Sequence, residues 1–142
     1  MPVTVAVAPV PLDAALQSSL RRVYADYPGF ASPEAAVAAL AEAANAGDTL
    51  YTAVFNARVI AAALTHGAGD ARHMRYLCVH AASRGRGVAE RLVAEIHRLE
   101  AARGHRWLEA DSDVNQEGVV DALLAVGFIP YGEGHYRCPL SF

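Results

Sequence analysis

A turn with two glycines, Arg84-Gly85-Arg86-Gly87-Val88-Ala89, separates two stretches with different hydrophobic periods. The stretch before it, Arg72 to His80, is a predicted strand, with Met74, Tyr76, Cys78 and His80 on one face and Leu77 and Val79 on the other. The stretch after it, Val88 to Arg103, carries apolar residues at helical spacing and ends at Gly104. A strand that passes through a glycine turn directly into an amphipathic helix indicates a fold that mixes the two element types.

The chemistry of this turn suits an anion. Gly85 and Gly87 have no side chain to keep a ligand from the backbone, and the first amides of the helix lack an intrahelical acceptor. Arg84 and Arg86 add positive charge where a pyrophosphate would lie. An ordinary helix start with two solvated arginines explains the same residues equally well, because short glycine motifs also match by chance.

Two families of nucleotide-binding proteins do not fit. A P-loop requires a lysine, and all twelve basic residues of this chain are arginines. A dinucleotide-binding fingerprint requires a third small residue where Glu90 stands. The net charge of −3 gives no reason to expect nucleic acid as a partner.

The remaining pattern predicts eleven elements around this turn. Ser32 and Pro33 form a helix-start signal, and Asp113 with Gln116 forms a possible capping box before a helix that ends at Gly127. Residues Asn56 to Arg58 form the loop of a predicted hairpin. The expected strands are Val3–Val7, Leu50–Phe55, Val59–Leu64, Arg72–His80, Arg106–Asp111, Phe128–Tyr131 and His135–Leu140, and the expected helices are Leu12–Tyr27, Pro33–Gly47, Val88–Arg103 and Asp113–Val126.

The order of these elements is strand, two helices, three strands, helix, strand, helix, two strands. This α/β order differs from the strict alternation of a doubly wound parallel sheet. With 142 residues, we expect one domain over positions 1–142. The isolated Cys78 and Cys138 suggest a reducing compartment, and we expect a cytoplasmic protein without a signal peptide or membrane span.

Read together, Leu77 to His80, Arg84 to Ala89 and the later Gly127-Phe128 resemble the acetyl-CoA motif and a second landmark of the GNAT acetyltransferases. In that family's pattern, Arg/Gln-x-x-Gly-x-Gly/Ala, the matching positions are Arg84, Gly87 and Ala89. The resemblance implies a mixed, mostly antiparallel sheet of about seven strands flanked by four helices. It also implies acetyl-CoA or CoA as the ligand and N-acetyl transfer as the activity.

The resemblance also implies which residues meet the cofactor. Backbone groups of Leu77, Cys78 and Val79 would pair with the pantetheine arm. Arg84 and Gly85 would belong to the cofactor turn, and the amides of Arg86, Gly87, Val88 and Ala89 would hold the pyrophosphate. Asn115 matches a position that often contacts the cofactor, although a helix cap explains it equally well.

The sequence marks the catalytic groups less specifically than the cofactor turn. Many GNAT enzymes protonate the leaving thiolate with a tyrosine four residues before the Gly-Phe landmark, and here that position is Leu123. Glu109 and Asp111 are candidate bases beside the expected cleft, although solvated carboxylates at a strand end are the more ordinary interpretation. His66, His73 and His80 recur every seven residues, but this spacing alternates faces on strands, so no metal site is expected.

A closer resemblance covers roughly Leu50 to Cys138. Phe55 to Ala62, the arginine-rich turn, and Gly118-Val119-Val120 through Gly127-Phe128 resemble the PanZ-like proteins. The resemblance implies an acetyl-CoA sensor that regulates the maturation of aspartate decarboxylase and lacks the tyrosine acid. Two functions therefore stay open: transfer to a small amine or peptide N-terminus, and non-catalytic sensing through a protein partner.

Overall fold

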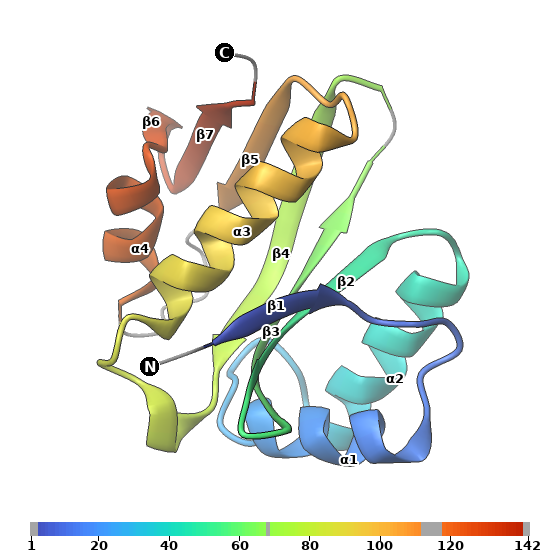
Figure 1. The fold of residues 1–142 in the computed structure, drawn as a ribbon. Coiled ribbons are helices and arrows are strands. Elements are labelled where there is room, and N and C mark those ends of the chain that lie inside the picture. The colour runs from blue at the N-terminus through green and yellow to red at the C-terminus, as the bar shows by residue number, and fades with distance from the viewer. Residues whose placement is uncertain (1–2, 68, 112–117, 141–142) are drawn as a thin grey trace.

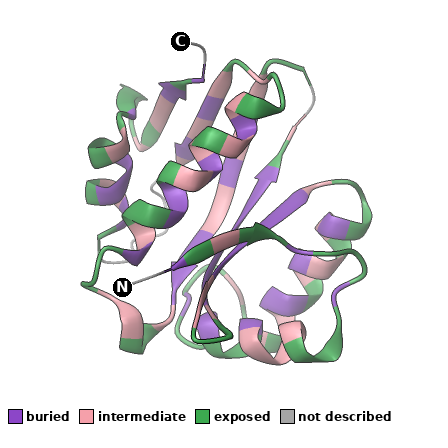
Figure 2. Cartoon of the chain, viewed as in Figure 1, coloured by how far each residue is buried: buried purple, intermediate pink, exposed green. Residues whose placement is uncertain are grey.

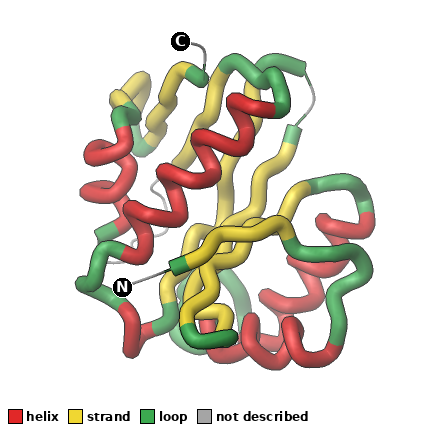
Figure 3. Tube along the Cα trace, in the orientation of Figure 1, coloured by secondary structure: helices red, strands yellow, loops and turns green. Residues whose placement is uncertain are grey.

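The fold is a seven-stranded sheet with four α-helices in the part of the chain that the computed structural model describes, residues 3–67, 69–111 and 118–140 (Figures 1 and 3). The predicted order of elements is confirmed, with a short 3₁₀ turn at Ala81–Ser83 as the one addition within these residues. The elements are β1 (Thr4–Val7), α1 (Ala14–Val23), α2 (Pro33–Asn45), β2 (Thr49–Phe55), β3 (Arg58–His66), β4 (Ala71–Val79), α3 (Val88–Ala102), β5 (Trp107–Asp111), α4 (Val119–Val126), β6 (Ile129–Gly132) and β7 (His135–Pro139).

The strands lie in the order β1-β2-β3-β4-β5-β7-β6. Among the described strands, every neighbouring pair is antiparallel except β4 and β5, which run parallel. The predicted mixed, mostly antiparallel sheet is therefore confirmed. The connection between the two parallel strands contains α3, as a crossover requires.

Helices cover the two faces of the sheet unequally. One apolar cluster joins α3 and α4 to strands across the sheet, whereas the other joins α1 and α2 to β2, β3 and β4 alone. Figure 2 shows the buried central strands and the exposed outer stripe of α3. On the face of the sheet that carries α1 and α2, this second apolar cluster therefore covers β2, β3 and β4 and does not extend over β5, β6 and β7.

Helix starts follow the side chains at their caps. Ser32 caps α2 by accepting a hydrogen bond from the Ala35 amide, and Pro33 occupies the first helical position, as predicted. Helix α1 is shorter than the predicted Leu12–Tyr27, because Asp13 caps its start and the chain leaves helical geometry at Tyr24. The Tyr24 hydroxyl instead donates a 2.6 Å hydrogen bond to the Tyr76 carbonyl on β4.

The loop between β2 and β3 is tighter than predicted. Asn56 and Ala57 alone form it, with φ of +52° and +62°, and Arg58 already pairs with Phe55. Two central residues with positive φ match the twist of the hairpin they join. Alanine rarely adopts this conformation, so the sequence carries only a weak signal for the two-residue turn.

Strand β4 contains a bulge at Tyr76. The pairs Ala62–Cys78 and Leu64–Arg75 leave one residue of β3 opposite two residues of β4, and Tyr76 has a φ of +59°. The predicted sharing of one face by Met74, Tyr76 and Cys78 is therefore wrong, since the bulge reverses the alternation. Met74 instead joins the α3-side cluster, which also contains Leu77 and Val79.

Candidate functional site

A cavity of about 310 Å³ opens where β4 and β5 separate. The two strands pair only from Ala71–Trp107 to Met74–Ala110, although β4 continues to Val79. The cavity therefore reaches through the sheet from one face to the other. Its apolar wall on the α3 side includes Met74, Leu77, Ala110, Val119 and Leu123, and its opposite wall includes Tyr27, His73, Arg75, Tyr76 and Asp111.

Asp111 lies between two histidines at the mouth of this cavity. His73 Nε2 is 3.1 Å from Asp111 Oδ2, and His135 Nδ1 is 2.5 Å from Asp111 Oδ1. The His135 contact follows from register, because His135 is the direct β7 partner of Asp111, whereas His73 is in register with Glu109 and reaches Asp111 two residues further along β5. With one nitrogen engaged by Asp111, the His73 ring retains a second nitrogen that can accept a proton when the imidazole is neutral.

Glu109, the other predicted carboxylate, lies outside the cavity lining. Its side chain forms an ion pair with Arg137, its direct register partner on β7. The Arg137 guanidinium also lies over the rings of Trp107 and Tyr131, 4.6 Å from each centroid. Glu109 therefore belongs to a packed ion-pair and aromatic group beside the cavity, and Asp111 is the predicted carboxylate that lines it.

Arg75 lines the same cavity and has no partner among the described residues. Its Nε is buried and makes no hydrogen bond, and its guanidinium forms no ion pair with any residue that the structure describes. Arg75 pairs through its backbone with Leu64, whose side chain belongs to the α1/α2-side cluster. This cationic side chain therefore faces the wall that also carries His73 and Asp111.

The glycine turn lies beyond the far end of β4. Gly85 and Gly87 have φ of +76° and +79°, and a Cβ on either would meet no atom within 4 Å. Backbone conformation therefore requires these glycines, while the space around them stays open. Gly87 caps α3, and a second cavity of about 150 Å³ extends from this turn and Val79 to Gly118 and Asp121 at the start of α4. Backbone amides at such a helix start suit a phosphate.

Arg84 is held by the protein itself. Its terminal nitrogens donate two 2.7 Å hydrogen bonds to Asp26, and its Nε donates one to the Val79 carbonyl. The hydrogen bond from Arg84 lowers the pKa of Asp26, and the same contact raises the pKa of Arg84. The charge expected over the cofactor turn is thus neutralised within the chain, which leaves Arg86, exposed in the turn, as the cation beside the glycines.

The other predicted cofactor residues are placed as follows. Leu77, Cys78 and Val79 form the buried end of β4, on the stretch that has separated from β5. Cys78 is fully buried, and its thiol donates to the Val23 carbonyl at 3.1 Å. Val88 and Ala89 begin α3. Asn115 lies outside the described residues, as do Asp113 and Gln116 of the predicted capping box.

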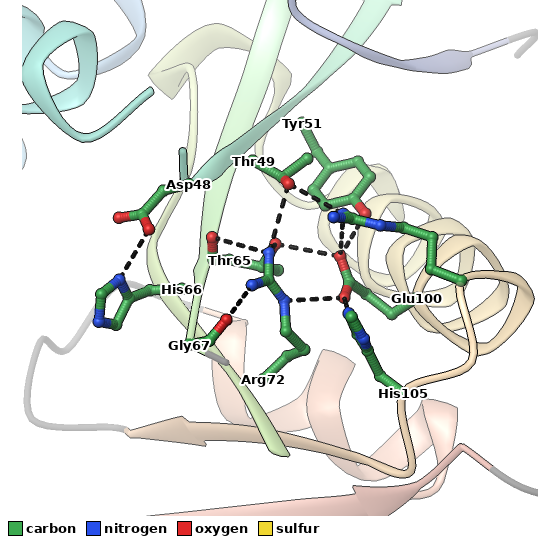
Figure 4. A network of polar contacts seen from close by, with 10 residues as sticks. Asp48, Thr49, Tyr51, Thr65, His66, Gly67, Arg72, Glu100 and His105 are labelled. Carbon is green, nitrogen blue, oxygen red and sulfur yellow. Dashed lines mark hydrogen bonds and ion pairs between the residues drawn. The ribbon is translucent and has the colours of Figure 1, made fainter. Parts of the chain in front are cut away.

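A second polar cluster lies at the opposite end of α3 (Figure 4). Glu100 is fully buried and accepts hydrogen bonds from Arg72, Tyr51 and Thr65. Arg72 satisfies its remaining nitrogens with the Gly67 and Thr65 carbonyls and with threonine hydroxyls. Because the Glu100 carboxylate and the Arg72 guanidinium find their partners within the chain, this cluster ties α3 to the sheet.

Metal binding and membrane crossing find no support in the described residues. Histidines, cysteines and carboxylates form no group of three placed to hold an ion in residues 3–67, 69–111 and 118–140. His66 contacts Asp48, whereas its register partner His73 contacts Asp111. The described helices are each too short or too polar to span a bilayer.

Reasoning from the sequence missed His73 and Arg75 as cavity residues. Both lie on the predicted strand Arg72–His80, so their position near the cofactor turn was visible. Their shared face was not, because it depends on a strand neighbour, β5, that comes about thirty residues later in the chain and runs parallel. A histidine and an arginine two residues apart on a predicted strand were the available signal.

A family model described as "Acetyltransferase (GNAT) domain, PanZ" matches residues 13–136. This match begins well before Leu50, where the resemblance noted in the sequence begins, and includes both N-terminal helices. Among curated proteins, no relative matches the sequence significantly.

Solved structures match the fold over nearly the whole chain. The ribosomal-protein-S18-alanine N-acetyltransferase from Escherichia coli has a TM-score of 0.76 at 14% identity, covering 99% of this chain and 96% of its own. A phosphinothricin acetyltransferase from Sinorhizobium meliloti, in complex with acetyl-CoA, has a TM-score of 0.71 at 18% identity, covering 98% and 89%. A GNAT-family N-acetyltransferase from Escherichia coli, in complex with CoA, has a TM-score of 0.70 at 16% identity, covering 98% and 82%. At these identities the matches establish the predicted GNAT fold.

Proposed function

This chain belongs to the PanZ family of GNAT acetyltransferase domains, and from that membership we propose that it binds acetyl-CoA and transfers the acetyl group to a primary amine. The observation that carries the proposal is the path from the glycine turn, along the end of β4 that extends beyond its register with β5, to the cavity that holds His73 and Asp111. Solved relatives of the same fold contain acetyl-CoA or CoA, which supports this ligand.

The proposed cofactor path uses groups that fit its parts. The amides from Arg86 to Ala89 take the pyrophosphate, because the glycines leave open space in front of the α3 start. The backbone of Leu77 to Val79 pairs with the pantetheine arm where β4 extends beyond its register with β5, apart from the Val79 carbonyl, which accepts a hydrogen bond from Arg84. The thioester then lies in the 310 Å³ cavity, against the apolar wall that contains Leu123.

The proposed reaction needs a proton acceptor more than a proton donor. The amine nitrogen attacks the thioester carbon, a C–N bond forms, and the C–S bond breaks to release the thiolate. His73 accepts the proton that the amine loses, and Asp111 orients the ring and balances its positive charge. Leu123, which is fully buried, has no proton to donate, so the thiolate takes its proton from water.

Leu123 also favours a second candidate function. A buried leucine in place of the usual tyrosine acid suits a protein that binds acetyl-CoA without consuming it, as the PanZ-like resemblance implies. In that case the ligand would control binding to a protein partner such as aspartate decarboxylase. Calorimetry of aspartate decarboxylase binding, with and without acetyl-CoA, tests this function directly.

One experiment tests the cofactor site with a matched control. Gly87 and Gly104 stand at opposite ends of α3 with φ of +79° and +88°, and a Cβ at either position would meet no atom within 4 Å. Valine at either position imposes similar backbone strain, but only Gly87→Val places a side chain at the proposed phosphate site. We expect acetyl-CoA to raise the melting temperature of wild type and Gly104→Val, and not of Gly87→Val.

The same proteins decide between the two functions. Wild-type thiol release from acetyl-CoA on any member of an amine panel would support transfer and exclude a purely sensing role. Silence on every amine, with the acetyl-CoA melting shift intact, would contradict transfer and leave the sensor. An equal shift in Gly87→Val and Gly104→Val would contradict the glycine turn as the cofactor site.

A further inference from the structure

Arg75 presents a positive charge to the cavity without an acceptor from the described chain. Three other arginines with partly or fully buried side chains have a carboxylate partner. Arg84 is paired with Asp26, Arg137 with Glu109, and Arg72 with Glu100. A guanidinium donor that is buried without an acceptor destabilises a protein, so a partner from outside the chain would satisfy it.

We propose that Arg75 binds the carboxylate of the acetyl acceptor, which makes the acceptor a small free amino acid. This inference rests on the proposed transfer to an amine and names the class of that amine. It assigns to Arg75 the recognition of the substrate's acid group, and to His73 with Asp111 the proton of its amino group.

The chemistry of the wall favours a carboxylate over a phosphate. One guanidinium carries one positive charge and presents a planar fork that fits a carboxylate with two parallel hydrogen bonds. A phosphate dianion would leave excess negative charge beside Asp111, which lines the same cavity. A monoanionic carboxylate therefore matches the charge that Arg75 supplies.

The position of Arg75 separates it from the proposed cofactor phosphates. Val79 lies four residues after Arg75 on the strand, and because the bulge at Tyr76 takes up one of them, the two positions are about 10 Å apart at an ordinary strand rise. The glycine turn lies beyond Val79, where Arg86 is an exposed cation. An anion bound at Arg75 is therefore a group at the reacting end of the cavity.

The spacing of the wall suits an amine and an acid within one small molecule. His73 and Arg75 lie two residues apart on one face of β4, so their Cα atoms are about 7 Å apart. An amino acid carries its two charged groups a few bonds apart and fits between the two side chains. The cavity, at about 310 Å³, is at the small end of the range for ligand sites.

The proposed step is balanced by groups already named. The neutral amino group of the amino acid forms the C–N bond, the thioester C–S bond breaks, and His73 takes the amine proton. The carboxylate stays ionised on Arg75 throughout and takes no part in bond making. The products are an N-acetylamino acid and CoA.

Wild-type protein alone provides the first test. Thiol release from acetyl-CoA is measured with each of the common amino acids and with its carboxamide, for example alanine and alaninamide. Amidation lowers the basicity of the amine and supplies more of its reactive neutral form, so chemistry alone favours the amides. We expect the amino acids to have kcat/KM values about 10- to 100-fold higher than their amides, because the amide cannot pair with Arg75.

Variants then assign the preference to Arg75. In Arg75→Gln the acid-over-amide ratio is expected to fall to near one, and in Arg75→Lys to an intermediate value, because lysine keeps the charge without the fork. Arg106→Gln removes an exposed arginine outside the cavity and is expected to keep the wild-type ratio. Should Arg75→Gln fail to fold, Arg75→Lys and the wild-type comparison still carry the test.

A binding measurement separates this inference from the proposed transfer. Calorimetric titration of amino acids into CoA-loaded wild type and Arg75→Gln requires no turnover. Amino-acid binding that is present in wild type and lost in Arg75→Gln supports the carboxylate site, whether or not any amine is acetylated. The absence of acetylation contradicts only the proposed acetyl transfer. An N-acetylated peptide with a free C-terminus forms the third arm.

Three results would overturn the inference. Equal kcat/KM for acids and amides in wild type shows that the carboxylate is not recognised. An acid preference that survives in Arg75→Gln assigns recognition to another group. Binding of the blocked peptide, without binding of any free amino acid, identifies a polypeptide C-terminus as the occupant instead.

Discussion

Arg72 and Arg75 lie three residues apart on β4 and differ in almost every contact. Arg72 faces α3, is 5% exposed, and donates to Glu100, Gly67, Thr49 and Thr65. Arg75 faces the opposite wall, where its buried Nε meets no acceptor from the described residues. The partners of Arg72 all come from the chain itself, whereas the side chain of Arg75 has no partner among the described residues.

This difference separates a charge that stabilises the fold from one that is available to a ligand. Burying a charge is unfavourable unless ion pairs and hydrogen bonds compensate it, and the polar cluster around Glu100 supplies both for Arg72. The cavity wall supplies them only in part, for two histidines hold Asp111 whereas no described side chain holds Arg75. Substitutions in the two regions should therefore change different measurements.

The largest expected effect is on stability, at Arg72. Arg72→Met leaves the Glu100 carboxylate buried without its main cation and should lower the free energy of unfolding by about 3–5 kcal/mol. Arg75→Met removes a cation that no described residue pairs with and should change it by less than about 1 kcal/mol. Urea unfolding followed by circular dichroism at neutral pH measures both.

A double substitution sharpens this comparison. Arg72→Met with Glu100→Leu removes both charges, so most of the loss seen in Arg72→Met should be recovered. Equal losses of unfolding free energy in Arg72→Met and Arg75→Met would show that the two arginines stabilise the fold equally and would contradict the expected difference.

The next effect is on turnover, at His73. His73→Asn should lower kcat/KM for acetyl transfer by about 10²-fold or more, equivalent to about 2.7 kcal/mol, because the proposed proton acceptor is removed. His66→Asn is the matched control, since His66 is the register partner of His73 but contacts Asp48. Equal activity in the two variants would remove His73 from the proposed chemistry.

The third expected effect is a loss of stability at alkaline pH, and it depends on Tyr51 in the polar cluster around Glu100. Burial, followed by the hydrogen bond to Glu100, raises the pKa of Tyr51 to about 12. An unfolded tyrosine ionises near pH 10, so the stability from the neutral phenol is complete below about pH 10 and is lost as the pH rises through about 12. We expect this part of the pH dependence to amount to about 2–3 kcal/mol and to be absent in Tyr51→Phe.

Tyr24 is the control for this measurement, because burial also raises its pKa. Tyr24→Phe should remove a separate part of the alkaline transition and leave the part that depends on Tyr51. Identical alkaline curves for wild type and Tyr51→Phe would contradict the proposed role of the Glu100 network.

The smallest effect is at the exposed ion pair beside the glycine turn. Asp26 is half-exposed, so Asp26→Asn should cost no more than about 1 kcal/mol at neutral pH. Because Arg84 lowers the pKa of Asp26, this contribution is present above the ordinary carboxyl pKa near 4 and is lost as the pH falls through the lowered value. Stability curves of wild type and Asp26→Asn should therefore converge in acid, and a difference that persists there would contradict this assignment.

Local patterns were sufficient for most of the fold. Helical periodicity and the Ser32-Pro33 signal located α2 and α3 within a few residues, and the order of element types indicated the sheet class. The bulge at Tyr76 was not predictable, because a left-handed tyrosine has no sequence signal and is held by a hydrogen bond from Tyr24, far away in the chain. It is this bulge that reversed the predicted faces of β4.

The candidate site was predictable only where it is continuous in sequence. The glycine turn and the end of β4 lie within one segment, so a single pattern contains both. The pairing of Arg84 with Asp26 and of His73 with Asp111 joins residues far apart in the chain, so it depends on tertiary packing. Whether Arg75 has a partner depends on every residue packed around it, including residues distant in the sequence, so no local sequence pattern predicts it.

The bulge in β4 also sets how related sequences should be aligned. A straight strand would reach the glycine turn with one residue fewer after Arg75, so alignment to such a strand requires a single-residue gap between Arg75 and Leu77. Without the gap, every position before the bulge is assigned to the wrong face, and Arg75 exchanges places with a core residue. Searches for the cavity arginine in distant relatives should therefore count backwards from the bulge, not from the glycine turn.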